Sequence, residues 1–296
     1  MNNLINKNTI IKKFVFPYPH IVFENFFEEK LYKNLEKNFP LEVEFEKVEN
    51  KVNRMNYDIS YGDELYSNLI KKNSSYNELH KFIYSNNFVN YFLKKFKNEI
   101  INEIFEKFLT QNVLNFPINP EPFEVDEIIN KRTHKSNDNR KILYPRLDIG
   151  MGKKNYGINT GGKGIHIDNP QRLISILFYL GGYSSVDGGE HRIWKVKNSE
   201  NLELEKEIQP KPNLLIASLQ NNISFHDVKP IKEIVGSRNA FYIAISSSVK
   251  IWKDAKNNNL NKKFNRNRYI SKSFTEKIKK FLQKFYKNQN EYNNNS

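Results

Sequence analysis

The sequence predicts a mainly β-sheet core preceded by a helical N-terminal part, and three observations support this fold class. Residues 142–250 contain apolar runs of strand length separated by turn residues. Residues 25–110 instead carry apolar side chains at helical spacing. The chain has 296 residues, of which 38% are hydrophobic, so it can bury a sizeable core. We therefore expect a single domain over residues 1–250 and a C-terminal extension over residues 251–296.

The first predicted helix follows a short extended lead-in that closes with a strand at residues 21–23. Asn25 and Glu28 match a capping box for a helix that runs to about Asn38 and stops at Pro40. Its apolar positions recur every four residues and give one buried face: Phe27, Leu31 and Leu35.

A longer helical pattern over residues 76–110 predicts two further helices, which we expect to buttress the sheet. Residues 116–141 hold prolines at 117, 120 and 122 and then a polar charged run, which predicts a long loop. Long loops in compact domains often act as lids or binding loops. The extension at 251–296 is rich in Lys and Asn, and its amphipathic stretch from Phe274 to Tyr286 predicts a partly helical tail.

Several strand patterns follow one another in the β core. Residues 172–180 and 213–219 are apolar runs typical of buried strands, and a turn at 187–190 leads to a predicted strand at 191–194. A further strand opens at Arg238, and its alternate residues define two faces. One face is small and partly polar, as a ligand-holding lumen requires: Arg238, Ala240, Tyr242 and Ala244. The other face is bulky and apolar: Asn239, Phe241, Ile243 and Ile245.

A candidate metal site lies within this β core. His166 and Asp168 are two residues apart, so both side chains point to the same face of a strand. His226 comes from a distant strand end and completes a set of two imidazoles and one carboxylate. Such a set binds non-haem Fe(II) on one face and leaves the other positions open for cosubstrate and O₂. Arg238, shortly after the second histidine, is suited to anchor an acidic cosubstrate.

A bare His-x-Asp is a weak signal, and the ordered context strengthens it. The features that follow it in order are the strand ending in Tyr179-Leu180, the Gly188-Gly189-Glu190 turn, Pro212, the His226-Asp227-Val228-Lys229-Pro230 segment and Arg238. This set resembles the Fe(II)/2-oxoglutarate-dependent oxygenases of the prolyl-hydroxylase-like branch. The resemblance covers roughly residues 144–248, and residues 17–27 resemble the opening of bacterial and phage members, many without an assigned substrate.

The resemblance implies a double-stranded β-helix, a jelly-roll or cupin-like core that helices buttress. It implies that His166, Asp168 and His226 bind Fe(II), that Arg238 pairs with the distal carboxylate of 2-oxoglutarate, and that Tyr179 donates a hydrogen bond to it. The implied reaction uses O₂, decarboxylates 2-oxoglutarate to succinate and hydroxylates a substrate that the sequence does not identify, either a small molecule or a peptide.

Some features leave alternatives open. Relatives supply an upstream cosubstrate contact from an earlier strand, and both Tyr144 and Arg146 are candidates for it. His191 follows the Gly-Gly-Glu turn outside the triad pattern, and we expect it to be exposed. The alternative function is a non-catalytic or 2-oxoglutarate-independent cupin-type metal-binding protein. Cupin-type sites commonly use more histidines and lack a carboxylate-anchoring arginine.

Composition restricts the remaining classes. The chain has no cysteine, so disulfides and thiolate metal sites are excluded, and it lacks a signal-peptide pattern and any apolar run of transmembrane length. We therefore expect a cytoplasmic protein. Residues 252–296 contain twelve Lys and Arg against three acidic residues, which is +9 of the net charge of +14. Because the core is only mildly basic, and Ala244 occupies a position where nucleic-acid-repairing relatives carry a second arginine, the sequence disfavours a nucleic-acid partner. No pattern indicates an oligomeric state.

Overall fold

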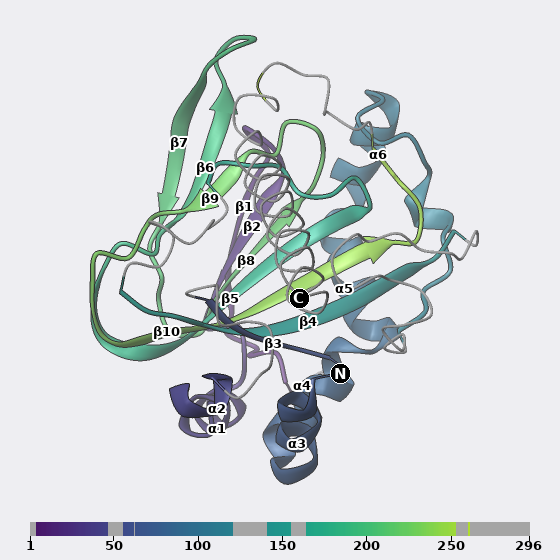
Figure 1. The fold of residues 1–296 in the computed structure, drawn as a ribbon. Helices are drawn as coiled ribbons and strands as arrows, with labels where there is room; N and C mark the ends of the chain where they lie inside the picture. Colours follow the sequence, from purple (N-terminus) through teal and green to yellow (C-terminus); the bar gives the residue numbers. More distant parts are fainter. Residues whose placement is uncertain are drawn as a thin grey trace, which may run out of the picture.

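The computed structural model describes residues 4–46, 56–61, 63–120, 141–154, 164–252 and 260, in which helices cover one side of a large antiparallel sheet (Figure 1). The helices of these residues are α1 (Glu29–Lys37), α2 (Glu42–Glu46), α3 (Glu64–Lys72), α4 (Ser74–Ile83), α5 (Asn86–Lys95) and α6 (Lys97–Phe105), with a 3-10 turn at Val113–Asn115. None of the described helices is long and apolar enough to cross a membrane. The fold is mainly β with an N-terminal helical part, as the sequence predicts.

The large sheet has seven strands in the order β1-β2-β8-β5-β10-β4-β3. These strands are β1 (Ile10–Phe14), β2 (His20–Glu24), β8 (Leu214–Leu219), β5 (Arg172–Asp187), β10 (Glu233–Ser247), β4 (Leu143–Gly152) and β3 (Asn56–Ser60). The long strand β10 lies between β5 and β4 and fixes the register of the sheet, because Tyr242 pairs with Leu177 on one side and with Asp148 on the other.

A smaller sheet of three strands, in the order β7-β6-β9, faces the large sheet (Figure 1). Its strands are β6 (His191–Val196), β7 (Leu202–Ile208) and β9 (His226–Val228). The segment around His166 continues this layer, since His166 forms an antiparallel bridge with His226. From β4 to β10 the chain thus crosses repeatedly between the two layers, with β4, β5, β8 and β10 in the large sheet and β6, β7 and β9 in the small one, which is the arrangement of a double-stranded β-helix.

The two faces of the large sheet bury different residues. Alternate residues of β5 and β10 point toward the helices and join the main apolar core, among them Phe178 and Phe241. Their neighbours Tyr179 and Ala240 point into the lumen between the two sheets, where they join a smaller cluster with Ile193 of β6. The division of β10 into an apolar face and a small, partly polar face is therefore confirmed.

The N-terminal helices differ from the prediction in two respects. Helix α1 begins at Glu29 without a side-chain cap, so the capping box on Asn25 is wrong. The side-chain amide of Asn213 accepts a hydrogen bond from the Phe27 backbone N–H at 2.9 Å and donates one to the Phe27 carbonyl at 2.9 Å. These bonds hold residues before the helix in an extended conformation next to β8, because they occupy backbone groups that a helix needs.

The pattern at 76–110 contains parts of three helices, α4, α5 and α6, rather than two. The Ser85 hydroxyl accepts a hydrogen bond from the Phe88 N–H and begins α5, and a break at Phe96 separates α5 from α6. Most of the predicted loop at 116–141 and the predicted helix at 274–286 lie outside the described residues. The division of the chain at residue 250 stays a prediction.

Candidate metal centre

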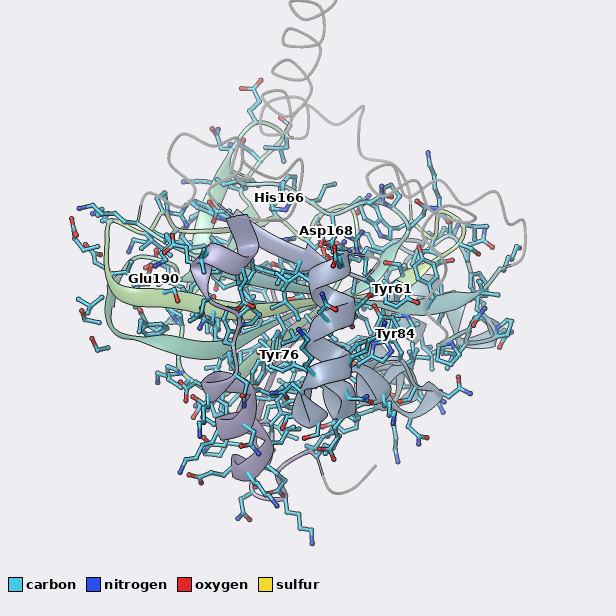
Figure 2. The ribbon with its side chains drawn as sticks, turned by 60° about the horizontal axis from the view of Figure 1, so that its bottom comes forward. Tyr61, Tyr76, Tyr84, His166, Asp168 and Glu190 are labelled. Atoms are coloured by element: carbon cyan, nitrogen blue, oxygen red, sulfur yellow. The ribbon has the colours of Figure 1, made fainter. Side chains whose placement is uncertain are left out.

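The structure brings the three predicted metal-ligating residues together at the mouth of the lumen. One candidate ligand atom from each of His166, Asp168 and His226 lies within 4.8 Å of the others. The backbone N–H and carbonyl groups of His166 and His226 pair reciprocally at 3.0 and 2.9 Å, which sets the two imidazoles side by side with ring centroids 4.5 Å apart. His166 and Asp168 lie close together (Figure 2), and both are buried. Two imidazoles and a carboxylate at this spacing fit a divalent transition metal.

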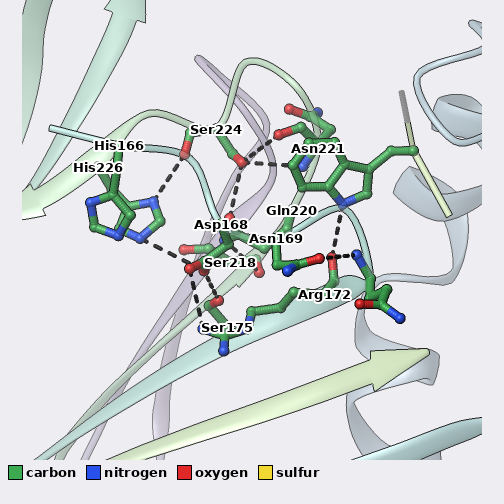
Figure 3. Close-up of polar contacts among 12 residues, drawn as sticks. His166, Asp168, Asn169, Arg172, Ser175, Ser218, Gln220, Asn221, Ser224 and His226 are labelled. Carbon is green, nitrogen blue, oxygen red and sulfur yellow. Dashed lines mark hydrogen bonds and ion pairs between the residues drawn. The ribbon is translucent and has the colours of Figure 1, made fainter. Parts of the chain in front are cut away.

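Hydrogen bonds fix which nitrogen each imidazole presents. The Nδ1 atom of His166 lies 2.7 Å from the Gly164 carbonyl. The Nδ1 atom of His226 lies 2.9 Å from the Ser224 carbonyl (Figure 3). A carbonyl oxygen only accepts, so each Nδ1 carries the proton and each Nε2 keeps its lone pair. This arrangement is typical of metal-ligating histidines, whose second nitrogen donates to a carbonyl or carboxylate.

The carboxylate of Asp168 is also held in place (Figure 3). Arg172 Nη1 donates to its Oδ1 at 3.2 Å, and the hydroxyl of Ser175 donates to its Oδ2. The same Oδ2 lies 3.8 Å from His226 Nε2. Because Arg172 and Ser175 both come from β5, the strand that forms the floor of the lumen positions the carboxylate. Such outer contacts orient a ligand and tune its affinity for a metal.

Arg238 is fully buried at the other end of the lumen. Its Nη1 donates to the Gly189 carbonyl at 3.0 Å, and its Nη2 donates to the Tyr242 hydroxyl at 2.9 Å. The Tyr179 hydroxyl also donates to the Gly189 carbonyl, at 3.3 Å, and the guanidinium carbon lies 5.7 Å from the centre of the Tyr179 ring. A Cβ at Gly152 would lie 3.2 Å from Arg238 Nε, so glycine there leaves room for the guanidinium. Arg238 and Tyr179 thus share one pocket.

Both upstream candidates lie on the same face of β4. Tyr144 pairs with Ser246 and Arg146 with Ala244, so both side chains share the lumen face of the sheet. Arg146 donates two hydrogen bonds to Asp148 Oδ1, at 3.2 and 3.0 Å. Tyr144 is buried, and burial raises the pKa of its hydroxyl to about 12. The charge of Arg146 is therefore neutralised by Asp148, while Tyr144 offers a protonated hydroxyl.

The position of His191 contradicts the expectation that it is exposed. Only 7% of its surface is accessible, and its ring centroid lies 5.7 Å from that of His226. Burial lowers the pKa of the His191 imidazole well below its ordinary value. Strand alternation explains this position, because Ile193 pairs with His226 and points into the lumen, so His191 two residues earlier does the same. That alternation is readable in the sequence and could have identified His191.

His20 is a further buried histidine of the lumen, and no pattern in the sequence assigns it a role. Its Nδ1 donates to the Tyr18 carbonyl at 2.9 Å, and its ring stacks on Phe14 at 4.8 Å. Burial lowers the pKa of His20 to about 4, so the ring is neutral at pH 7. It comes from β2 of the large sheet, whereas His191 comes from the smaller sheet.

Comparison with known proteins gives structural neighbours of one class. No family model and no curated protein matches the chain. A prolyl 4-hydroxylase from Phytophthora capsici is 15% identical with a TM-score of 0.44, and the match covers 77% of this chain and 59% of the hydroxylase chain. An oxidoreductase of the 2OG-Fe(II) oxygenase family from Burkholderia pseudomallei is 20% identical with a TM-score of 0.26, covering 35% of this chain and 43% of its own.

A viral collagen prolyl hydroxylase from Paramecium bursaria Chlorella virus-1 is a further neighbour, 17% identical with a TM-score of 0.26, covering 36% of this chain and 60% of its own. The neighbours are thus prolyl 4-hydroxylases and 2-oxoglutarate–Fe(II) oxygenases, the class that the sequence motifs resemble. This chain covers less than two thirds of the length of each of the three. At these identities and TM-scores the likeness supports no conclusion about this chain, and the chemistry of the site follows from its own residues.

Proposed function

We propose that this protein is an Fe(II)- and 2-oxoglutarate-dependent oxygenase that hydroxylates a substrate still to be identified. The observation that carries the proposal is the convergence of His166, Asp168 and His226, with ligand atoms within 4.8 Å of one another and both histidine Nδ1 atoms already donating to carbonyls. Only the Nε2 lone pairs and the carboxylate then remain to face a common point. That donor set suits Fe(II) with open positions for cosubstrate and O₂.

In this proposal the iron, when bound, supplies the chemistry that couples decarboxylation of 2-oxoglutarate to succinate with hydroxylation of a C–H bond. The protein supplies the binding and the orientation. Arg172 and Ser175 fix the Asp168 carboxylate, and the two backbone carbonyls fix the histidine rings. The two sheets enclose the lumen and keep bulk water from the reacting groups.

Arg238 is the proposed anchor for the distal carboxylate of 2-oxoglutarate. Arg238 is fully buried and donates to the Gly189 carbonyl and to the Tyr242 hydroxyl, and its planar fork of donors has the geometry that binds a carboxylate. Tyr179 is the proposed second contact, because its hydroxyl lies with Arg238 at the Gly189 carbonyl. For the upstream contact we propose Tyr144 over Arg146, because Asp148 already neutralises the arginine.

The test is anaerobic reconstitution with Fe(II), followed by measurement of bound iron and of succinate formed from 2-oxoglutarate in air. Wild-type protein is expected to bind one equivalent of iron and to form succinate, and His166→Ala or Asp168→Ala is expected to abolish both. Iron binding without any dependence on 2-oxoglutarate would favour the cupin-type alternative. Full turnover in both variants would show that the triad assignment is wrong.

A further inference from the structure

The imidazole of His191 is buried and forms no hydrogen bond within the described part of the chain. Neither its Nδ1 nor its Nε2 has a hydrogen-bond partner there, although only 7% of the residue is exposed. An unsatisfied buried donor or acceptor is unfavourable, so such groups in native proteins call for an explanation. A ligand that enters the lumen and bonds to the ring is one explanation with a testable consequence.

The position of His191 indicates which ligand that is. Residues 189, 191 and 193 follow one another on the lumen side: the Gly189 carbonyl accepts from Arg238, and Ile193 pairs with His226. His191 therefore stands between the proposed cosubstrate anchor and the proposed metal ligands. It also lies within electrostatic range of His226 and Asp168 as well as of Arg238. A molecule that reaches from the triad to Arg238 must pass the imidazole of His191.

We propose that His191 is a binding residue for the acidic cosubstrate, which hydrogen-bonds the dicarboxylic 2-oxo acid held between the His166–Asp168–His226 triad and Arg238. This inference rests on the proposed function, whose cosubstrate it takes as the ligand. An imidazole carries at least one N–H donor in either protonation state, so it suits a carboxylate oxygen. The pocket then binds the acid through Arg238, Tyr179 and His191. It therefore favours a dicarboxylic over a monocarboxylic 2-oxo acid of equal length.

The experiment measures binding rather than turnover. Full-length protein is loaded with Mn(II), the Mn(II) affinity is measured by electron paramagnetic resonance, and 2-oxoglutarate is titrated by calorimetry. His191→Leu is expected to weaken 2-oxoglutarate binding roughly tenfold or more, because it removes a hydrogen bond to a charged group, while Mn(II) binding stays close to wild type. His191→Gln, which keeps a donor, is expected to recover part of the affinity. 2-Oxopentanoate, which lacks the distal carboxylate, is expected to bind weakly to every variant.

The matched control is His80→Leu, which makes the same change in helix α4, where the histidine hydrogen-bonds Tyr66. It is expected to leave 2-oxoglutarate affinity unchanged. A second readout uses wild type alone: adding 2-oxoglutarate to Zn(II)-loaded, ¹⁵N-histidine-labelled protein is expected to protect one His191 ring N–H from exchange. This readout decides the question even if His191→Leu does not fold.

Two outcomes overturn the inference and separate it from the proposed function. If wild type binds 2-oxoglutarate but His191→Leu binds it within about twofold, His191 is not a cosubstrate contact and the oxygenase proposal stands. If Mn(II)-loaded wild type binds no 2-oxoglutarate, both proposals fail together.

Discussion

The two faces of the large sheet differ in what they bury, although the same strands form both. On the side of the helices, Phe178 stacks on Phe241 at 5.7 Å and meets Phe27 edge-on at 4.8 Å. On the lumen side of the same strands, Tyr179 and Arg238 share a pocket with a backbone carbonyl. Well-packed aromatic rings stabilise the fold, whereas a buried guanidinium destabilises it unless it is paired.

The difference indicates where stability and function are located. The helix-covered face carries a large share of the apolar burial. The lumen face instead holds buried polar groups, among them His191, whose ring nitrogens have no hydrogen-bond partner among the described residues. Departures from good packing and hydrogen bonding are expected at functional sites, where the rest of the fold compensates for them. Substitutions on the two faces should therefore separate stability from activity.

The sharpest comparison sets His226→Ala against Phe241→Ala. Phe241 is fully buried against Tyr76 and Phe178, so its truncation should lower the free energy of unfolding by about 3–5 kcal/mol. His226→Ala should abolish Fe(II)-dependent succinate formation and change stability far less, since one side of its ring faces the polar lumen. Urea denaturation measures the first effect, and iron content with succinate assays measures the second.

Phe241→Ala that remains folded serves as the control for metal binding, and it should still bind iron. If His226→Ala destabilises the protein as strongly as Phe241→Ala, the lumen is a packed core and the contrast between the two faces is wrong. If Phe241→Ala loses iron at full stability, the two faces are coupled more directly than the packing indicates.

Arg238 tests the far end of the lumen. Arg238→Ala should raise the apparent KM for 2-oxoglutarate roughly tenfold or more, because removing one partner of a buried charge pair costs about 2–5 kcal/mol of binding free energy. Iron binding should stay nearly intact. Arg238→Lys should be milder, because lysine keeps the charge and loses the planar fork of donors. An unchanged KM in the alanine variant would show that Arg238 is not the anchor.

The sequence was informative about the lumen and less so about the helices, for physical reasons. Strand alternation has a fixed period of two, and iron ligation restricts the residue types, so the triad and the faces of β10 follow from local pattern. The start of α1 does not, because Asn213 binds the backbone of Phe27 from 186 residues away and overrides a local capping signal. The expectation that His191 is exposed was wrong although the alternation of β6 carries the information, because His191 lies outside the triad motif.

Glu103 of α6 lies where the helical layer meets the loop before His226, and it should make stability depend on pH. Its Oε1 accepts a hydrogen bond from Asn221 Nδ2 at 2.6 Å, and its Oε2 has no partner among the described residues. Burial raises the pKa of this carboxyl to about 7, against the opposing effect of the Asn221 hydrogen bond.

Because the folded protein holds this proton more tightly than the unfolded chain, the contribution to stability is present below about pH 4.5 and is lost as the pH rises to about 7. The loss is on the order of 3 kcal/mol. Unfolding free energies measured between pH 4.5 and pH 8 should therefore fall less steeply in Glu103→Gln than in wild type. Parallel profiles for the two proteins would show that the carboxyl titrates alike in the folded and unfolded states.

The smallest effect is expected at Ser175, on the lumen face of β5. Its hydroxyl donates to Asp168 Oδ2, the oxygen that lies 3.8 Å from His226 Nε2. Ser175→Ala should weaken Fe(II) binding about tenfold through loss of ligand orientation, the lower end of the range for such contacts, because Arg172 still holds the other oxygen. Competition with a chelator measures the iron affinity. Ser218→Ala, on neighbouring β8, is the matched control, and an equal loss in both would mean that serine hydroxyls in this sheet act on stability and not on the Asp168 carboxylate.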